Sequence, residues 1–78
     1  KTCDLIYVYD NEPRNKEIVS RIERCVRGNR RVVIWPNSIG QKDINDMVLA
    51  GHDIMSVLES NTYLGLEAQV QFNNWKRV

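Results

Sequence analysis

The order of its apolar segments constrains the fold of this chain more than any other feature. A β-branched and aromatic run at residues 3–10 predicts a strand, and a second such run at 31–35, halted by Pro36, predicts another. One helix-length segment separates the two runs, so we expect a right-handed crossover that leaves the two strands parallel. The first strand is expected to be buried on both faces, as parallel strands usually are.

An amphipathic helical pattern lies between the two strands. Asn15 can cap the helix, and Gly28 can end it in the left-handed conformation. Its apolar residues recur at helical spacing. They are Ile18, Val19, Ile22, Cys25 and Val26.

Three further helices are expected beyond Pro36. The first runs from a cap at Asp43 to Gly51, the second starts within 52–53, and the last starts within 61–62. The last helix would carry one apolar stripe and then fray over 73–78. The stripe consists of Leu64, Ala68 and Phe72.

Together these segments predict the α/β class, with a small parallel sheet and C-terminal helices in a single domain over 1–78. The chain of 78 residues is 42% hydrophobic and 27% charged, which is typical of a folded globular domain near the lower size limit. Two strands alone do not form a stable sheet, so either further strands precede this segment or the helices pack on an unusually small sheet. The chain begins at Lys1 without an initiating Met, and we expect it to be a segment of a longer polypeptide.

Cysteine usage and hydropathy indicate a reducing compartment. Cys3 and Cys25 lie far apart on apolar faces without metal-ligand spacing, which favours buried reduced thiols over a disulfide or a zinc site. No apolar run approaches the roughly 18 residues of a membrane span, and no secretion signal opens the chain. We therefore expect a cytoplasmic protein with no membrane partner.

Carboxylates follow both predicted strands. Asp10 and Glu12 come where the first apolar run ends, and Asp43 comes after the second. Parallel α/β proteins bind ligands beyond the carboxyl ends of strands, and neighbouring strands lie less than about 5 Å apart, so the three carboxylates could share one edge. Hard oxygen ligands there would suit Mg²⁺ or Mn²⁺. The alternative is that they belong to ordinary turns and that Asp43 is only a helix N-cap.

Basic residues concentrate between positions 14 and 31, offset there only by Glu17 and Glu23. They are Arg14, Lys16, Arg21, Arg24, Arg27, Arg30 and Arg31. This patch could neutralise nucleic-acid phosphates, or it could be the solvated face of a helix. Arg14 differs from the others, because it lies two residues after Glu12, where a guanidinium could hold a phosphate in a bidentate manner.

Several common catalytic patterns are missing from the sequence. No Ser/His/Asp or Cys/His arrangement and no phosphate-binding glycine loop occurs. His52 is the only histidine, and we expect it to be a capping or surface residue. Trp35 and Trp75 are expected to serve packing.

Three segments together resemble the C-terminal part of the DNA primases of T-even-type bacteriophages. They are Tyr-Val-Tyr-Asp-Asn-Glu-Pro-Arg at 7–14, Val-Ile-Trp at 33–35 and Lys-Asp-Ile-Asn-Asp-Met at 42–47, with Gly-Leu-Glu-Ala at 65–68 in support. The resemblance covers most of the chain. It implies the second half of a Toprim domain, a Rossmann-like catalytic fold shared by bacterial-type primases, topoisomerases and some nucleases.

The resemblance also implies roles for individual residues. In Toprim domains an Asp-x-Asp or Asp-x-Glu motif after one strand and a further Asp after the next hold catalytic Mg²⁺. By that match Asp10, Glu12 and Asp43 are catalytic metal ligands. We also expect Arg14 and Lys42 to steady the nucleotide triphosphate or the template. The family's catalytic Glu, in a Glu-Gly turn after an earlier strand, is not in this sequence. The chain alone is therefore expected to be inactive and to bind Mg²⁺ or Mn²⁺ only weakly.

The function implied is synthesis of short RNA primers from ribonucleotides on single-stranded DNA, in the cytoplasm of an infected bacterium and beside a replicative helicase. Two alternatives stay open. One is the phosphodiester chemistry of Toprim nucleases and topoisomerases. The other is a non-catalytic helicase-docking module, because residues 53–75 add nothing obvious to the carboxylates.

Overall fold

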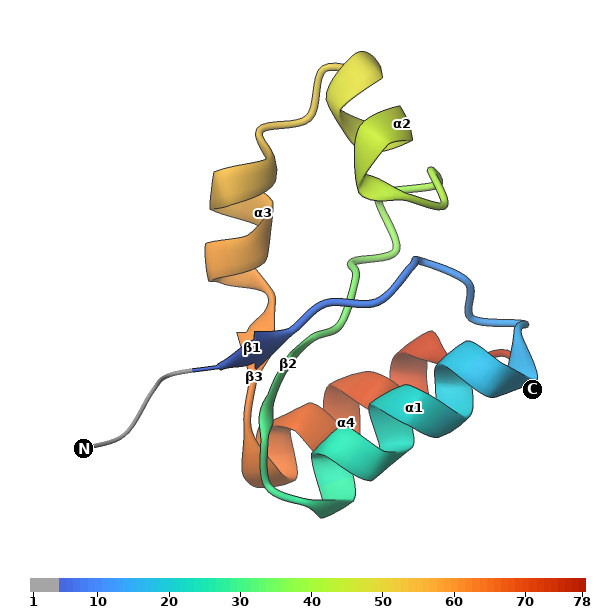
Figure 1. Ribbon diagram of the computed structural model, residues 1–78, viewed down its shortest axis with the longest axis vertical. Helices are drawn as coiled ribbons and strands as arrows, with labels where there is room; N and C mark the ends of the chain where they lie inside the picture. Colours follow the sequence, from blue (N-terminus) through green and yellow to red (C-terminus); the bar gives the residue numbers. More distant parts are fainter. Residues whose placement is uncertain (1–4) are drawn as a thin grey trace.

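The computed structural model describes residues 5–78 of the chain. The predictions made for Cys3 and for the start of the first strand, at positions 3 and 4, lie outside the described residues. The elements are β1 (Ile6–Tyr7), α1 (Lys16–Arg27), β2 (Arg31–Val33), α2 (Ile44–Leu49), α3 (Ile54–Ser60), β3 (Thr62–Tyr63) and α4 (Gly65–Trp75), as Figure 1 shows. None of the helices within 5–78 is long and apolar enough to cross a membrane.

The three strands form one small mixed sheet in the order β1-β2-β3. β1 pairs with β2 in parallel, with Ile6 opposite Arg31, which confirms the predicted strand–helix–strand unit. β3 pairs with β2 in the antiparallel direction, with Tyr63 opposite Val32. The α/β class and the C-terminal helices are confirmed, and the fold is compatible with part of a Rossmann-like unit.

The third strand corrects the prediction that the last helix starts within 61–62. The Asn61 Nδ2 and Thr62 Oγ1 atoms donate to the carbonyls of Val57 and Leu58, at 2.8 and 2.5 Å, so these side chains close α3 and do not open α4. The backbone N–H of Ile34 donates to the carbonyl of Asn61 at 3.0 Å, which prolongs the pairing with β2. Pairing with β2 therefore outweighs the local capping preference that favoured a helix start at Asn61 or Thr62.

The core lies between the sheet and a layer formed by α1 and α4, which lie side by side below the sheet in Figure 1. The fully buried residues with the largest side chains are Phe72, Ile22, Met47, Val32 and Val33. Cys25 is a buried free thiol, and Trp35 packs in the same core, both as expected. Leu64 instead lies exposed before α4, so its predicted place on the buried stripe is wrong.

The first strand is not buried on both faces as predicted. Leu5 is 65% exposed and Ile6 48% exposed, and β1 forms one edge of the sheet. Short, apolar and unpaired at one edge, β1 differs from the central strand of a parallel sheet.

Two helices end in the same hydrogen-bonded motif, with different residues in the left-handed position. After α1 that residue is Asn29, at φ 56°, while Gly28 is at φ −81°, so the prediction for Gly28 is one residue too early. After α2 it is Gly51 at φ 93°, as predicted. α3 begins from Asp53, whose side chain accepts the N–H of Ser56.

Candidate functional site

The two acidic turns lie against each other, and Asn11 joins them. Its backbone N–H donates to the carbonyl of Lys42 at 2.6 Å. Its side-chain Nδ2 donates to the carbonyls of Ile39 and Gln41 at 3.0 and 2.9 Å. The chain leaving β1 therefore meets the loop that leads from β2 to α2 (Figure 1), which confirms that the two turns share one edge.

The end of α4 fixes the same edge from the other side. The Trp75 Nε1–H donates to Asn11 Oδ1 at 3.0 Å, and Trp75 is only 4% exposed. The backbone N–H of Arg77 donates to the carbonyl of Pro13 at 2.8 Å. The prediction that residues 73–78 fray is therefore wrong, and the helical tail is part of the structure that holds the acidic turn.

Sequence reasoning did not identify Asn11 as the residue that organises this edge. Its backbone N–H, its amide nitrogen and its amide oxygen are all hydrogen-bonded. The only local signal is that Asn often bonds backbone groups in turns. The side-chain partners lie 28, 30 and 64 positions away, so no short motif could have named them.

The three predicted carboxylates occupy this edge in different settings. Asp10 is exposed, and its backbone carbonyl accepts the N–H of Glu12 at 2.9 Å. Glu12 is half-buried, and its Oε1 accepts a hydrogen bond from Asn15 Nδ2 at 3.3 Å. Asp43 is half-buried and caps α2, with Oδ1 accepting the N–H of Asp46 at 2.8 Å. The N-cap role of Asp43 is thus confirmed, and it engages one carboxylate oxygen.

Within residues 5–78, no three His, Cys, Asp or Glu side chains lie close enough together to hold a metal ion as they stand. The chemistry of the donors at this edge still fits a hard cation, because carboxylates from two joined turns are oxygen ligands of the kind that Mg²⁺ prefers. The metal site therefore stays a prediction.

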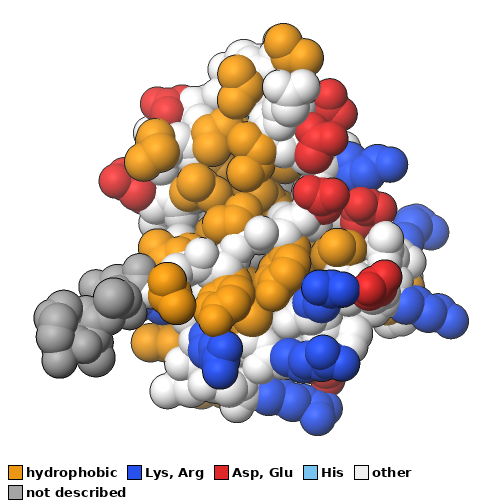
Figure 2. All heavy atoms as spheres, viewed as in Figure 1, with side chains coloured by type: hydrophobic (Ala, Val, Ile, Leu, Met, Phe, Trp, Pro, Cys, Tyr) orange, Lys and Arg blue, Asp and Glu red, His pale blue; other side chains and the backbone are white. Residues whose placement is uncertain are grey.

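A cavity of about 300 Å³ opens beside the acidic turns. Glu12, Arg14 and Lys42 all line it, together with Gly40, which has no side chain. Asp10 and Asp43 do not line it. At the upper right of Figure 2, acidic side chains gather over α2 and the neighbouring loops, next to Lys and Arg side chains. The hollow thus combines one carboxylate with two cationic groups, an arrangement that suits a phosphate-bearing ligand accompanied by a metal ion.

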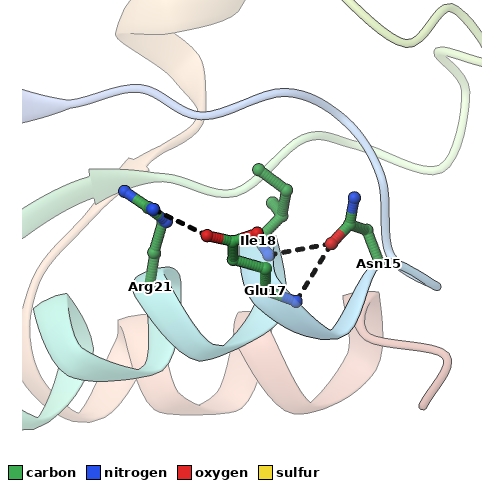
Figure 3. A network of polar contacts seen from close by, with 4 residues as sticks. All are labelled: Asn15, Glu17, Ile18 and Arg21. Atoms are coloured by element: carbon green, nitrogen blue, oxygen red, sulfur yellow. Dashed lines mark hydrogen bonds and ion pairs between the residues drawn. The ribbon is translucent and has the colours of Figure 1, made fainter.

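α1 begins directly after the acidic turn and is firmly capped there, as Figure 3 shows. Asn15 Oδ1 accepts the backbone N–H groups of Glu17 and Ile18 at 3.0 and 3.2 Å, as the sequence predicts. One turn on, Arg21 pairs with Glu17 at 2.8 Å. The hydrogen bond and the charge of Arg21 lower the pKa of Glu17. This cap fixes where the turn ends and the helix starts.

Comparison with known proteins gives one relative. The chain is 30% identical over 78 residues to the DNA primase of Enterobacteria phage T4. The chain is therefore similar to one segment of a phage DNA primase. The alignment covers 94% of the chain but 23% of the phage protein, so the chain spans less than a quarter of the relative that it matches. No protein-family model matches the chain, and the Toprim assignment stays a prediction.

Proposed function

We propose that this chain is part of a DNA primase, which synthesises short RNA primers on single-stranded DNA during phage replication by Mg²⁺-dependent nucleotidyl transfer. Two findings support the proposal. The similarity to a phage DNA primase extends over 94% of the chain. The hydrogen bonds of Asn11 hold the two acidic turns at one edge, and this is the observation that carries the proposal.

The proposed roles belong to residues on the two joined turns and in the neighbouring cavity. Asp10, Glu12 and Asp43 would hold Mg²⁺ or Mn²⁺, and Asp43 can do so while it caps α2, because the cap uses only Oδ1. The bound ion would neutralise charge on the nucleotide phosphates and favour in-line attack by the primer 3′-hydroxyl. Arg14 and Lys42, which line the neighbouring cavity with Glu12, contact the triphosphate or the template strand.

The Asn11 hydrogen bonds give this site its geometry. They fix the distance between the turn at 10–13 and the loop at 39–42, and Trp75 holds the Asn11 side chain in place. Positioning of this kind supplies much of the catalysis of phosphoryl transfer, since the protein contributes little covalent chemistry. The same proposal places the parent protein in the cytoplasm of the infected bacterium, with a replicative helicase as partner.

A pair of matched substitutions tests the proposal. Asp43→Asn and Asp53→Asn each replace an acidic N-cap by Asn, which caps helices as well as Asp does, so both helices should persist. Only Asp43→Asn removes a charge from the proposed metal ligands. Primer synthesis should be measured in the full-length protein that contains this chain, with Mg²⁺ titrated.

We expect Asp43→Asn to lower activity at least about 100-fold, since even outer-shell partners of metal ligands contribute roughly 10- to 100-fold. Asp53→Asn should leave activity close to that of the wild type. Equal activity of the two variants would contradict the proposed site. Nucleotide incorporation by the 78-residue chain alone would contradict the expectation that catalysis needs the rest of the parent protein.

A further inference from the structure

A second cavity, of about 350 Å³, lies between β1 and α1, away from the acidic turns. Its walls carry two tyrosines and three arginines, and no acidic side chain from residues 5–78 lines it. They are Tyr7, Tyr9, Arg21, Arg24 and Arg30. Figure 2 shows Lys and Arg side chains beside a band of hydrophobic side chains over this part of the molecule. The basic patch seen in the sequence thus contributes to a hollow that also holds aromatic rings.

Tyr7 is the last residue of β1, and Tyr9 follows two positions later. Both side chains line the cavity next to α1. Both are half-buried, and the Tyr9 hydroxyl lies 3.8 Å from Cys25 Sγ. Burial, and then the contact with Cys25, raises the pKa of Tyr9, so its phenol is uncharged at neutral pH. An uncharged ring does not repel a phosphate.

The arginines differ in how far their charge is already balanced. Arg21 pairs with Glu17 at 2.8 Å. Arg30 instead donates to the Tyr7 hydroxyl at 2.9 Å, with its guanidinium carbon 5.7 Å from the Tyr7 ring centroid. No ion pair joins Arg24 or Arg30 to an acidic side chain in the part of the chain that the structure describes. Their two charges are therefore available to an anionic ligand.

We propose that this cleft binds single-stranded DNA, with Arg24 and Arg30 on the backbone phosphates and a base stacked on the Tyr7–Arg30 pair. Sites for single strands combine a basic groove with aromatic faces on which unpaired bases stack. An acidic peptide would use the arginines but not the rings. The choice of DNA over RNA rests on the proposed function, whereas the cleft is argued from its own residues.

The charge contribution can be tested with two substitutions on one helix. Arg24→Gln and Arg27→Gln remove the same charge from α1, but Arg27 pairs with Glu23 and does not line the cleft. Binding of a fluorescent oligothymidine of about 12 nucleotides to the 78-residue chain is followed by anisotropy, in EDTA and at several salt concentrations. Site sizes for single strands run from roughly 4 to 16 nucleotides, so one oligomer spans the cleft.

We expect Arg24→Gln to weaken binding several-fold and to reduce the slope of log K against log [salt] by about 0.7, the loss of one phosphate contact. Arg27→Gln should leave both the binding affinity and the salt slope nearly unchanged. Equal weakening by both variants would mean attraction to general positive charge and would overturn the proposal, as would failure of the wild type to bind at low salt.

A second pair of substitutions, both at Tyr7, tests the contribution of base stacking. Tyr7→Phe keeps the ring, and Tyr7→Leu removes it. Tyr7→Leu should weaken binding about five-fold or more, and Tyr7→Phe should stay within about two-fold of the wild type. A backbone amide spectrum checks that each variant is folded. Should Tyr7→Leu not fold, an abasic oligomer of equal length tests the wild type directly. Equal binding of the abasic and thymidine oligomers, or of folded Tyr7→Leu and the wild type, would refute the stacking.

These measurements are independent of the proposed metal site, since EDTA removes divalent ions and no nucleotide is incorporated. If Arg24→Gln and Tyr7→Leu bind the oligomer as tightly as the wild type, DNA binding in the cleft is refuted. The Asp43→Asn test of primer synthesis is not affected by that result. The reverse pattern, with the cleft confirmed and Asp43→Asn fully active, would remove the proposed catalytic site and leave the binding site standing.

Discussion

The layer formed by α1 and α4 and the arm formed by α2 and α3 are built in different ways. α1 buries four residues and α4 three, whereas α2 buries only Met47 and α3 buries none. In Figure 1 the layer lies along the lower side of the sheet, and α2 and α3 extend away from it at the top. The arm also exposes large apolar residues, among them Leu49 and Met55. Burial thus stabilises the layer, and the arm depends more on capping and hydrogen bonds.

This difference matters because the acidic edge lies where the two regions meet. Asp43 caps the first helix of the arm, while Trp75, at the end of the layer, holds Asn11. Regions with few buried apolar contacts open locally at lower free energy than a packed core does. We therefore expect the loop that carries Asp43 to adapt to a ligand, while Asp10 and Glu12 stay fixed by the layer through Asn11.

The largest effect expected from this comparison comes from the same substitution in the two regions. Ile22→Ala removes a fully buried side chain of α1 and should lower the free energy of unfolding by about 2–5 kcal/mol. Ile54→Ala, on α3, removes a half-buried side chain and should cost less than about 2 kcal/mol. Urea denaturation measures both. Equal costs would show that the arm is packed as tightly as the layer.

The next largest effect concerns the connection between the regions. Asn11→Ala leaves the Trp75 Nε1–H and two backbone carbonyls without their hydrogen-bond partner. We therefore expect the free energy of unfolding to fall by about 1–3 kcal/mol. Nuclear Overhauser contacts between the turn at 10–13 and the loop at 39–42 should weaken as well. Asn45→Ala, at an exposed position of α2, is the control and should change stability little. An Asn11→Ala protein as stable as that control would remove the assigned role of Asn11.

A smaller effect should be confined to the arm. Asp53→Ala deletes the N-cap of α3 and should lower the free energy of unfolding by about 0.5–2 kcal/mol. Asp53→Asn keeps a capping side chain and should retain most of the wild-type stability. Native-state hydrogen exchange should show faster exchange in α3 and unchanged exchange in α1. Faster exchange spread evenly over both helices would mean that the arm and the layer open as one unit.

The smallest effect lies on the solvent side of the layer. Arg21 lowers the pKa of Glu17, so this pair stabilises the fold above the pKa that Glu17 has in the unfolded chain, and the contribution is lost as pH falls through the lower folded pKa. The pair is exposed and screened by water, so its effect on stability should be slight. Carboxyl NMR titration should show the pKa of Glu17 rising in Arg21→Gln. An unchanged pKa would show that the ion pair does not persist in solution.

The features that the sequence predicted well are those set by neighbours along the chain. Caps at Asn15, Asp43 and Asp53 act within three residues, and the apolar spacing of α1 correctly selects its buried face. The strand–helix–strand order also followed from local pattern. The meeting of the acidic turns then required only that the two strands be parallel.

What the sequence did not predict depends on distant partners. β3 forms because β2 offers it a free edge, which overrides the capping preference of Asn61 and Thr62. The hydrogen bond from Trp75 to Asn11 spans 64 positions. The exposure of β1 reflects which elements surround it, and no property of its own residues reveals that. Whether Asp10, Glu12 and Asp43 converge on an ion calls for a direct measurement.

Paramagnetic broadening of backbone amides by Mn²⁺ is that measurement. Titrated into the 78-residue chain, Mn²⁺ should broaden the amides of residues 10–12 and 42–46 first, at high metal concentration because binding is weak. Asp43→Asn should reduce this broadening, and Asp53→Asn should not. Broadening centred elsewhere, or spread evenly over the surface and indifferent to Asp43→Asn, would contradict a metal site at the edge that Asn11 builds.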